Sequence, residues 1–215
     1  EANLAIELGA DIYGSVSSVH SHSDGHKSSI SGPGVGNYIT MAKCAADAEK
    51  EIGLKPLRQN TFVHAHGTGT PANRTTESHI LNEIAQTFGI KKWPVSAIKS
   101  YLGHSMAPAS GDQLIASLGT WNSGVIPGIH STDALAEDVY SEHLDILLEN
   151  KTEEKNFYKG CFLNAKGFGG NNASAFILSP EETRIKIQSL VTKSKYDKYL
   201  KAVEKTRKNS IKYNE

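Results

Sequence analysis

The chain has 215 residues, of which 38% are hydrophobic and 19 are glycine, which is typical of a globular protein with one sizeable core. It contains no apolar run long enough to cross a membrane, no secretory signal opens it, and its formal net charge is zero. We therefore expect neither a membrane nor a nucleic acid among its partners. The chain lacks an initiator Met and its first residues read as mid-helix, so we expect a fragment, or a processed or split polypeptide.

Charge is unevenly distributed along the chain. Residues 181–215 carry ten Lys or Arg and five Asp or Glu, a net charge of +5. Residues 1–180 carry the remaining 13 basic and 18 acidic residues, a net charge of −5. A basic segment of this kind is usually a solvated surface and sometimes a docking arm for an acidic partner. We expect two units, a domain over residues 1–180 and a basic helical extension over residues 181–215.

Two cysteines, Cys44 and Cys161, lie far apart in the chain. Their number and separation do not suggest a disulfide framework and fit a reducing cytoplasm. Neither cysteine follows a strand-to-helix turn of the kind that lowers the pKa of a thiol. We therefore interpret both as packed, structural residues.

The predicted elements alternate between strands and helices as far as residue 121. Apolar spacing predicts the end of a helix at residues 1–9, a strand over 11–19, a helix from an Asn37 cap to about 51, a buried strand over 61–65, a helix over 73–88, a strand over 93–98 and a helix over 107–121. This alternation predicts a three-layer α/β fold.

The elements beyond residue 121 are less regular. We expect an extended segment over 125–129, a surface excursion with one short helix over 131–157, strands over 160–165 and 173–178, and a helical extension over 181–208. Because a glycine-rich loop joins the last two strands, we expect a hairpin-like return.

Three loops carry side chains suited to chemistry. They are His66-Gly-Thr-Gly-Thr-Pro71, Lys99-Ser-Tyr-Leu-Gly-His104 and Gly167-Phe-Gly-Gly-Asn-Asn172. The first two follow predicted strands, where α/β folds usually keep their chemistry. Thr68 and Thr70 each offer a hydrogen-bond donor and an acceptor. Two histidines presented in the same way indicate one assembled site.

In this order and at these spacings the three loops resemble the C-terminal half of the β-ketoacyl-acyl-carrier-protein synthases, the condensing enzymes of the thiolase fold. The resemblance covers roughly residues 1–180. It implies the C-terminal half of a thiolase-like three-layer α/β/α fold, followed here by a helical extension. It also implies decarboxylative Claisen condensation of an acyl thioester with malonyl-acyl carrier protein, in fatty acid or polyketide biosynthesis.

The resemblance assigns a role to each candidate residue. It implies catalytic roles for His66, His104, Lys99 and Phe168, substrate-binding roles for Thr68, Thr70, Gly169 and Gly170, and a supporting role for Glu77. The threonines would bind the phosphopantetheine arm, and the lysine would lie behind the second histidine. The phenylalanine would gate the site and donate its backbone N–H to an oxyanion hole. For the glutamate, pairing with the N-terminal dipole of its helix is an equally open interpretation.

Two histidines suit the implied chemistry. Decarboxylation of a malonyl thioester develops negative charge on an enolate oxygen, and two N–H donors aimed at that oxygen stabilise the charge. A neutral imidazole still donates one hydrogen bond. A nearby ammonium favours the neutral form, because like charge disfavours protonation.

The chain lacks one part of the family's machinery and departs from its motifs at several positions. The acyl-carrying cysteine of the family lies in the N-terminal half, so this chain alone should not form an acyl-enzyme. Residues 107–110 read Ala-Pro-Ala-Ser where the family usually has Gly-Ala-Ala-Gly. Gln113 stands for a usual glutamate, Lys166 for a usual phenylalanine and Asn171 for a usual threonine.

The resemblance also implies partners and location. It implies an acyl carrier protein as partner, malonyl and acyl thioesters as substrates, a homodimer, and a cytoplasmic enzyme. It implies no metal and no cofactor besides the phosphopantetheine of the carrier. Because acyl carrier proteins are acidic, we expect the basic extension near their docking surface.

Two other functions remain open. A metallohydrolase would use His20-x-His22-x-Asp24-x-His26 and the strand-end pair His64-x-His66. We interpret the first cluster as a solvated loop instead, because its Asp-Gly-His spacing is unusual and no further ligands complete a site. The second alternative is a non-elongating partner subunit, such as a decarboxylase-like protein or a chain-length factor.

Overall fold

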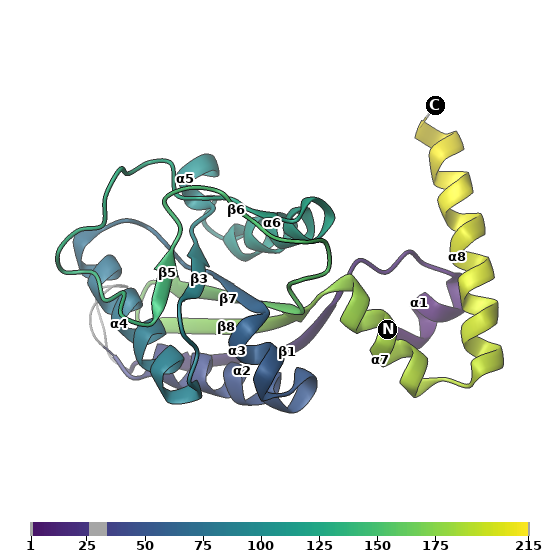
Figure 1. Cartoon of the computed structure of the whole chain (residues 1–215), viewed down its shortest axis with the longest axis horizontal. Coiled ribbons are helices and arrows are strands. Elements are labelled where there is room, and N and C mark those ends of the chain that lie inside the picture. The colour runs from purple at the N-terminus through teal and green to yellow at the C-terminus, as the bar shows by residue number, and fades with distance from the viewer. Residues whose placement is uncertain (1, 26–33, 215) are drawn as a thin grey trace.

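The structure, a computed structural model, describes residues 2–25 and 34–214 (Figure 1). Its elements in chain order are α1 (Ala2–Leu8), β1 (Ser15–Ser23), α2 (Gly36–Ile52), α3 (Leu54–Gln59), β2 (Thr61–His64), α4 (Pro71–Phe88), β3 (Trp93–Ser96), α5 (Lys99–Leu102), α6 (Ala109–Ser123), β4 (Val125–Ile126), β5 (Leu144–Ile146), β6 (Lys151–Thr152), β7 (Gly160–Gly167), β8 (Asn171–Leu178), α7 (Pro180–Leu190) and α8 (Lys193–Asn214).

Six strands form one mixed sheet in the order β1-β8-β7-β2-β3-β5. Strands β7, β2, β3 and β5 run parallel, whereas β8 is antiparallel to β7 and β1 is antiparallel to β8. The expected return through the glycine loop is confirmed, because Gly167 pairs with Asn171 next to the turn of the β7–β8 hairpin. Strands β4 and β6 form a separate antiparallel pair.

Helices cover both faces of this sheet, so the three-layer expectation is confirmed. Side chains such as Val63, Val95 and Phe162 pack toward α2, α3 and α4 on one face. Phe62 packs with the α6 residue Trp121 on the other face. Consecutive residues of β2 are therefore all buried, which explains why this strand reads as an apolar run. Figure 1 shows α6 above the sheet and α2 and α3 below it.

The parallel strands explain why three distant loops meet. The carboxyl ends of β2, β3 and β7 lie at the same edge of the sheet, since Val63 pairs with both Val95 and Phe162 in parallel register. The loops that follow these strands therefore share that edge. The four residues predicted to be catalytic all lie in these three loops.

The first strand lies later in the chain than predicted. We expected a strand over 11–19 and a polar loop from His20, whereas β1 continues through Ser23. Its backbone pairs with β8 from Ser15 opposite Leu178 to Ser23 opposite Asn171. Backbone pairing at the edge of a sheet does not require apolar side chains on both faces, so hydrophobic periodicity ended the strand too early.

The excursion over residues 131–157 was predicted wrongly. We expected one short helix there, but the segment contains none and instead adds β5 to the edge of the main sheet. Only Leu144 of the three β5 residues is buried. So short a strand with one buried apolar residue produces no periodic pattern.

Asn37 does not cap the helix that it was expected to begin. Val35 occupies the N-cap of α2, and Asn37 lies inside the helix, 1% exposed. Its side chain reaches Asn164 of β7, 127 positions away. The residue type that suits a cap also suits a buried polar contact, and the sequence alone does not distinguish the two.

The C-terminal extension is helical, as expected, but it consists of two helices. Ile187 of α7 packs with Tyr199 and Val203 of α8, and Ile6 of α1 completes this small cluster. Figure 1 shows α1, α7 and α8 to one side of the sheet and its covering helices. Among the described residues no helix is both long and apolar enough to span a bilayer.

Candidate functional site

His66 lies two residues beyond β2 and is 2% exposed. Its Nδ1 accepts a hydrogen bond from the backbone N–H of Lys166, near the end of β7, over 3.2 Å. A backbone N–H can only donate, so Nδ1 carries no proton and the neutral ring carries its proton on Nε2. This Nε2 is buried and has no hydrogen-bond partner among the described residues. The fold therefore presents an unused N–H donor at this position.

His104 has the same tautomer, set by a different turn. The backbone N–H of Met106 donates to Nδ1 of His104 over 3.1 Å, so the neutral ring again carries its proton on Nε2. Met106 has a φ of 66°, a conformation that is uncommon for a residue with a side chain. The centroids of the His66 and His104 rings lie 5.4 Å apart, with their planes at 81°. The two donors are thus neighbours.

The surroundings of His66 keep its ring neutral. Burial lowers the pKa of His66 to about 4, with Glu77 opposing this shift and Lys99, His104 and Lys166 adding to it. The Lys99 ammonium donates to the backbone carbonyl oxygen of His66 over 2.6 Å. Burial also lowers the pKa of Lys99. At neutral pH His66 is a hydrogen-bond donor that carries no charge.

Glu77 fixes the backbone of the first histidine loop. Its two carboxylate oxygens accept the backbone N–H groups of His66, over 2.7 Å, and Gly67, over 2.9 Å. Burial by itself would raise the pKa of Glu77, but the Lys166 charge and the donated hydrogen bonds outweigh burial and lower it. The side chain of Glu77 is 4% exposed, so the carboxylate that binds this loop is buried. The sequence left its role open between helix dipole and support of the site, and the contacts favour support.

Several polar side chains behind the histidines were given no supporting role from the sequence, although Asn37 was expected as a helix cap and Gln113 was noted in place of a usual glutamate. Asn164 of β7 donates to Glu77 over 2.7 Å and exchanges two hydrogen bonds with Asn37, of 2.7 and 3.1 Å. Gln113 of α6 donates through Nε2 to the carbonyl oxygens of Ala65, over 2.8 Å, and of Asn164, over 3.0 Å. An asparagine inside a largely apolar strand, three positions before Gly167, is the signal that could have marked Asn164.

Two cavities meet at His104. The histidine cavity, of about 640 Å³, is lined by His66 and His104, by β1 near His22, by residues 106–110 and by the ends of the β7–β8 hairpin. The α4 cavity, of about 740 Å³, is lined by residues 67–70, by α4, by Lys99 and His104, and by the segment 129–148. Both volumes lie in the range of ligand sites, roughly 300–1,000 Å³.

The other predicted site residues are distributed unequally between the cavities. Thr68 and Thr70 line the α4 cavity, with their hydroxyl oxygens 3.3 Å apart. Gly169 and Gly170 form the tip of the β7–β8 hairpin, with φ values of 76° and 79° that favour glycine. Phe168 is 69% exposed at the same tip and lines neither cavity. The structure thus brings the histidines, the lysine and the threonines to the two cavities, whereas Phe168, Gly169 and Gly170 line neither cavity.

The histidines of the alternative metal cluster serve other contacts. His20 lies 2.7 Å from Asp47 of α2, and Asp24 accepts the backbone N–H of Gly36 over 2.6 Å. His26 lies outside the described residues. His64 is fully buried against Phe62, with ring centroids 5.5 Å apart. Within residues 2–25 and 34–214 no three His, Cys, Asp or Glu side chains gather as metal ligands would.

Both cysteines are buried and free. Burial raises the pKa of Cys44 to about 11 and that of Cys161 to about 12. The Cys44 thiol donates to the carbonyl oxygen of Ser174 over 3.1 Å. Both side chains are therefore neutral packing groups at physiological pH, in agreement with the structural role expected from the sequence.

Comparison with known proteins agrees with this geometry. Residues 13–133 match the family described as beta-ketoacyl synthase, C-terminal domain. The chain is 48% identical over 204 residues to the beta-ketoacyl-[acyl-carrier-protein] synthase FabY of Pseudomonas aeruginosa, covering 95% of this chain and 32% of that protein. The crystal structure of that ketosynthase superposes with a TM-score of 0.94 over 99% of this chain and 33% of its own.

More distant ketosynthases share the fold. A ketosynthase from module 6 of the bacillaene synthase of Bacillus subtilis 168 is 23% identical, with a TM-score of 0.68 over 83% of this chain and 33% of that one. The chain thus spans about a third of the length of the Pseudomonas ketosynthase. The fold is the C-terminal half of a thiolase-like ketosynthase, and the chain belongs to the beta-ketoacyl synthase family, matching its C-terminal domain.

Proposed function

We propose that the natural polypeptide containing this chain is a β-ketoacyl-acyl-carrier-protein synthase that extends an acyl chain by decarboxylative Claisen condensation. The observation that carries the proposal is the pair of Nε2–H donors on His66 and His104. Each histidine has its Nδ1 occupied by a backbone N–H, and both rings line one cavity. Such a pair binds an oxygen on which negative charge develops.

The proposed reaction has two steps, decarboxylation of the malonyl group and attack of the resulting enolate on an acyl thioester. The malonyl carboxylate leaves as carbon dioxide, and the electrons of the broken C–C bond form an enolate whose oxygen accepts the two imidazole N–H groups. The enolate carbon then attacks the carbonyl of an acyl thioester, and the new C–C bond displaces the thiolate that held the acyl group. Because Cys44 and Cys161 are fully buried and line neither cavity, we assign that thiolate to a cysteine outside this chain.

The remaining candidate residues have supporting roles in this proposal. Lys99 and Glu77 hold the loop of the first histidine and its charge state, as their contacts with the His66 backbone suggest. Thr68 and Thr70, which line the α4 cavity, bind the phosphopantetheine arm of the carrier. The loop of Phe168, Gly169 and Gly170 presents backbone N–H groups to the acyl carbonyl, and the exposed phenylalanine is free to gate the site.

The partners and the division of the chain are parts of the same proposal. The printed name of the Pseudomonas relative supports an acyl carrier protein as partner, with phosphopantetheine as the carrier's own group. The proposal includes a homodimer and a location in the cytoplasm, and two free, buried thiols are consistent with that reducing compartment. A domain over 1–180 and an extension over 181–215 are supported by Pro180 opening α7 and by the separate cluster around Tyr199, in which α1 also takes part.

Loading and extension of an acyl group test the proposal directly. The natural polypeptide is incubated with an acyl thioester and then with malonyl-carrier protein, and the intact mass of each protein is measured by mass spectrometry. We expect one acyl group on a cysteine outside this chain and a β-ketoacyl product two carbons longer on the carrier. A polypeptide that releases carbon dioxide but accepts no acyl group would instead be a non-elongating partner subunit.

A further inference from the structure

Lys166 is a buried lysine near the end of β7. The residue is 8% exposed, and its backbone N–H is the group that donates to Nδ1 of His66 over 3.2 Å. The family usually has a phenylalanine at this position, so the positive charge is a feature of this chain. Burying an ammonium group is costly unless an anionic group lies nearby and hydrogen bonds satisfy it. An anionic group is therefore expected on the face of the sheet to which Lys166 points.

The alternation of β7 places the Lys166 side chain on the face of the sheet that carries Glu77. Phe162 packs toward α2 and α4, and Asn164 donates to Glu77 over 2.7 Å. Residues two positions apart in a strand point to the same face and lie roughly 7 Å apart. The pairing of β7 with β8 is regular as far as Lys166, which lies opposite Asn172, so no bulge turns the side chain to the other face. Lys166 therefore points to the region of the Glu77 carboxylate.

The Glu77 carboxylate accepts four hydrogen bonds. Oε1 accepts from the backbone of His66 and from Asn164, both over 2.7 Å. Oε2 accepts from the backbone of Gly67 over 2.9 Å and from the Asn73 side chain over 3.0 Å. An ionised carboxylate has about four acceptor positions, so a proton on either oxygen would point at a donor and find no acceptor. The loop of the first histidine thus keeps these contacts only while Glu77 is an anion.

A buried anion of this kind depends on a countercharge. Burial raises the pKa of Glu77, and the charge of Lys166 is the largest influence that lowers it again. Two other titratable groups act on the same carboxylate, His66 and Lys99. The imidazole is neutral at neutral pH, and the ammonium of Lys99 donates to the carbonyl oxygen of His66 over 2.6 Å. Lys166 is therefore the cation on which the charge of Glu77 depends most.

From this arrangement we infer that Lys166 is a positioning residue of the proposed reaction. Its ammonium group holds Glu77 as a carboxylate, Glu77 holds the backbone of His66 and Gly67, and this backbone determines where the Nε2–H of His66 points. The inference rests on the proposed function, in which that N–H stabilises the enolate oxygen. Lys166 acts from behind the histidine, through Glu77, and contact with the substrate is no part of its role.

A direct contact with the substrate is the alternative, because Lys166 also borders the histidine cavity. An ammonium group that binds the malonyl carboxylate would lower KM, and its effect would be independent of Glu77. An ammonium group that acts through Glu77 would instead affect kcat, and its effect would depend on pH. The two roles are therefore separated by kinetics at several pH values.

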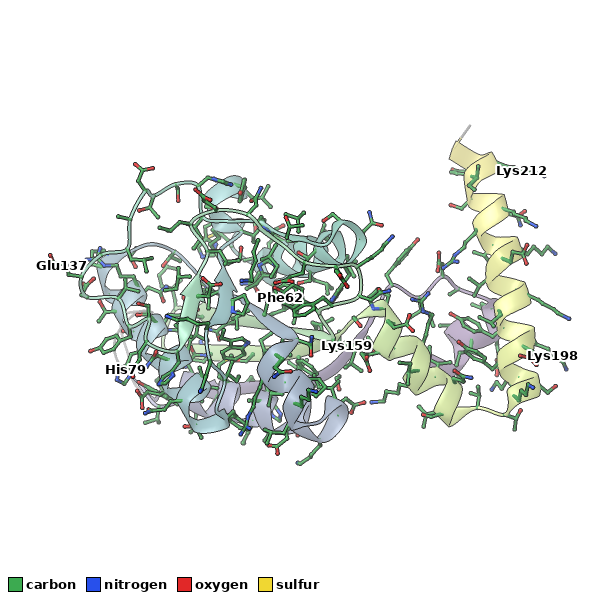
Figure 2. The ribbon with its side chains drawn as sticks, in the orientation of Figure 1. Phe62, His79, Glu137, Lys159, Lys198 and Lys212 are labelled. Atoms are coloured by element: carbon green, nitrogen blue, oxygen red, sulfur yellow. The ribbon has the colours of Figure 1, made fainter. Side chains whose placement is uncertain are left out.

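Substitution of Lys166 in the natural polypeptide tests the inference. Lys166→Met removes the charge, and Lys166→Arg retains it. Lys159→Met is the matched control, because Lys159 is half-buried just before the other end of β7 and pairs with Glu182 at 2.9 Å. Figure 2 shows Lys159 beside the start of α7. The rate of carbon dioxide release from malonyl-carrier protein is measured between pH 6 and pH 8, and kcat and KM are determined at each pH.

We expect Lys166→Met to make kcat sensitive to acid, because Glu77 then takes up a proton at a higher pH. An adjacent opposite charge changes the pKa of a carboxyl by about 1–3. The ratio of kcat at pH 6 to kcat at pH 8 should therefore fall on the order of tenfold below the wild-type ratio, with KM changed less than about twofold. Lys166→Arg and Lys159→Met should both keep the wild-type ratio.

Unfolding by urea provides a measurement that requires no activity. A carboxyl whose pKa is higher in the folded than in the unfolded state binds a proton on folding, so the folded state loses stability as the pH rises. Lys166→Met should therefore lower the free energy of unfolding more at pH 7 than at pH 5. With Glu77→Gln already present, it should lower it no more at pH 7 than at pH 5. These measurements test Lys166 even if the wild type releases no carbon dioxide, which would overturn the proposed function alone.

Three results would overturn the inference. One is the wild-type ratio of kcat at the two pH values in Lys166→Met or, if that variant does not fold, in Lys166→Gln; a raised KM beside it would assign Lys166 to the substrate. Another is an equal change of this ratio in Lys159→Met. The third is a loss of unfolding free energy in Lys166→Met that is the same at pH 5 and pH 7.

Discussion

At the scale of single residues, the site depends on two backbone N–H groups that fix the tautomer of His66 and His104. Lys166 and Met106 each donate to the Nδ1 of a histidine, and both rings then carry their proton on Nε2. Neither hydrogen bond was predictable from the sequence. The first joins residues 100 positions apart, and the second requires a left-handed backbone conformation at Met106. The histidines themselves were predictable, because each follows an apolar run and precedes small residues.

Glu77→Gln should destabilise the loop of the first histidine. An amide nitrogen in place of one carboxylate oxygen would face an N–H donor of His66 or Gly67 and leave it unpaired. A buried donor left without a partner costs about 1–3 kcal/mol in the free energy of unfolding. Urea unfolding of the natural polypeptide measures this. Glu83→Gln on the same helix is the control, and an equal effect of both variants would contradict the role assigned to Glu77.

His64 predicts a dependence of stability on pH. Burial lowers its pKa to about 4, so the unfolded chain binds more protons than the folded one between pH 4 and 6.5. Its contribution is therefore fully present above about pH 6.5 and is lost as the pH falls toward 4. The loss at pH 5 is about 2 kcal/mol. His64→Phe should reduce the fall in stability between pH 7 and pH 5 by this amount, measured by urea unfolding at both values.

His66 has a similarly lowered pKa, so it contributes in the same direction and over the same pH range. The His64→Phe variant must therefore retain a pH dependence of comparable size. If the variant and the wild type lose the same free energy of unfolding between pH 7 and pH 5, the assignment of a buried, neutral imidazole to His64 is wrong.

At the scale of elements, the sequence predicted the strands and helices that are apolar and periodic. β2, α4 and the β7–β8 hairpin were expected within a few residues of their ends, since their buried faces repeat regularly. Edge strands were not predictable in this way. β1 is held by backbone pairing along polar residues, and β5 has three residues, so neither leaves a complete hydrophobic pattern.

The segment 129–148, which contains β5, forms one wall of the α4 cavity and is fastened to α4. Arg74 donates to both carboxylate oxygens of Asp138, over 2.8 and 2.9 Å. The backbone N–H of Tyr140 donates to Ser78, and that of His143 donates to Asn82, over 3.1 and 2.9 Å. The charged pair is the exposed end of this attachment, and the two backbone hydrogen bonds remain when it is removed.

Arg74→Ala and Asp138→Ala should therefore loosen the cavity wall without unfolding the protein. We expect KM for the malonyl thioester to rise a few-fold in each variant, with kcat and Tm nearly unchanged. The double variant should resemble Asp138→Ala, since that change already removes the ion pair together with the 3.2 Å hydrogen bond from the Thr75 hydroxyl. Additive effects on KM, or a large fall in Tm, would show that the two residues act separately or hold the core.

At the scale of the whole molecule, the proposed function assigns to this chain one part of a reaction centre. The histidines, the lysine and the threonines lie together at one edge of the sheet. Cys44 and Cys161, the two cysteines of the chain, are buried, and burial raises the pKa of each. The extension places α8 beside α1. The packing of α1 with α8 was not predictable, because Ile6 and Val203 are separated by nearly the full length of the chain.

The most direct test of the account is the rate of carbon dioxide release from malonyl-carrier protein by the natural polypeptide and its His66→Ala and His104→Ala variants. If the two Nε2–H groups stabilise one enolate oxygen, each variant should release carbon dioxide on the order of a hundredfold more slowly, with the malonyl substrate still bound. The double variant should lose less than the product of the two single effects, because the donors serve the same oxygen. Release at the wild-type rate in either single variant would contradict the account.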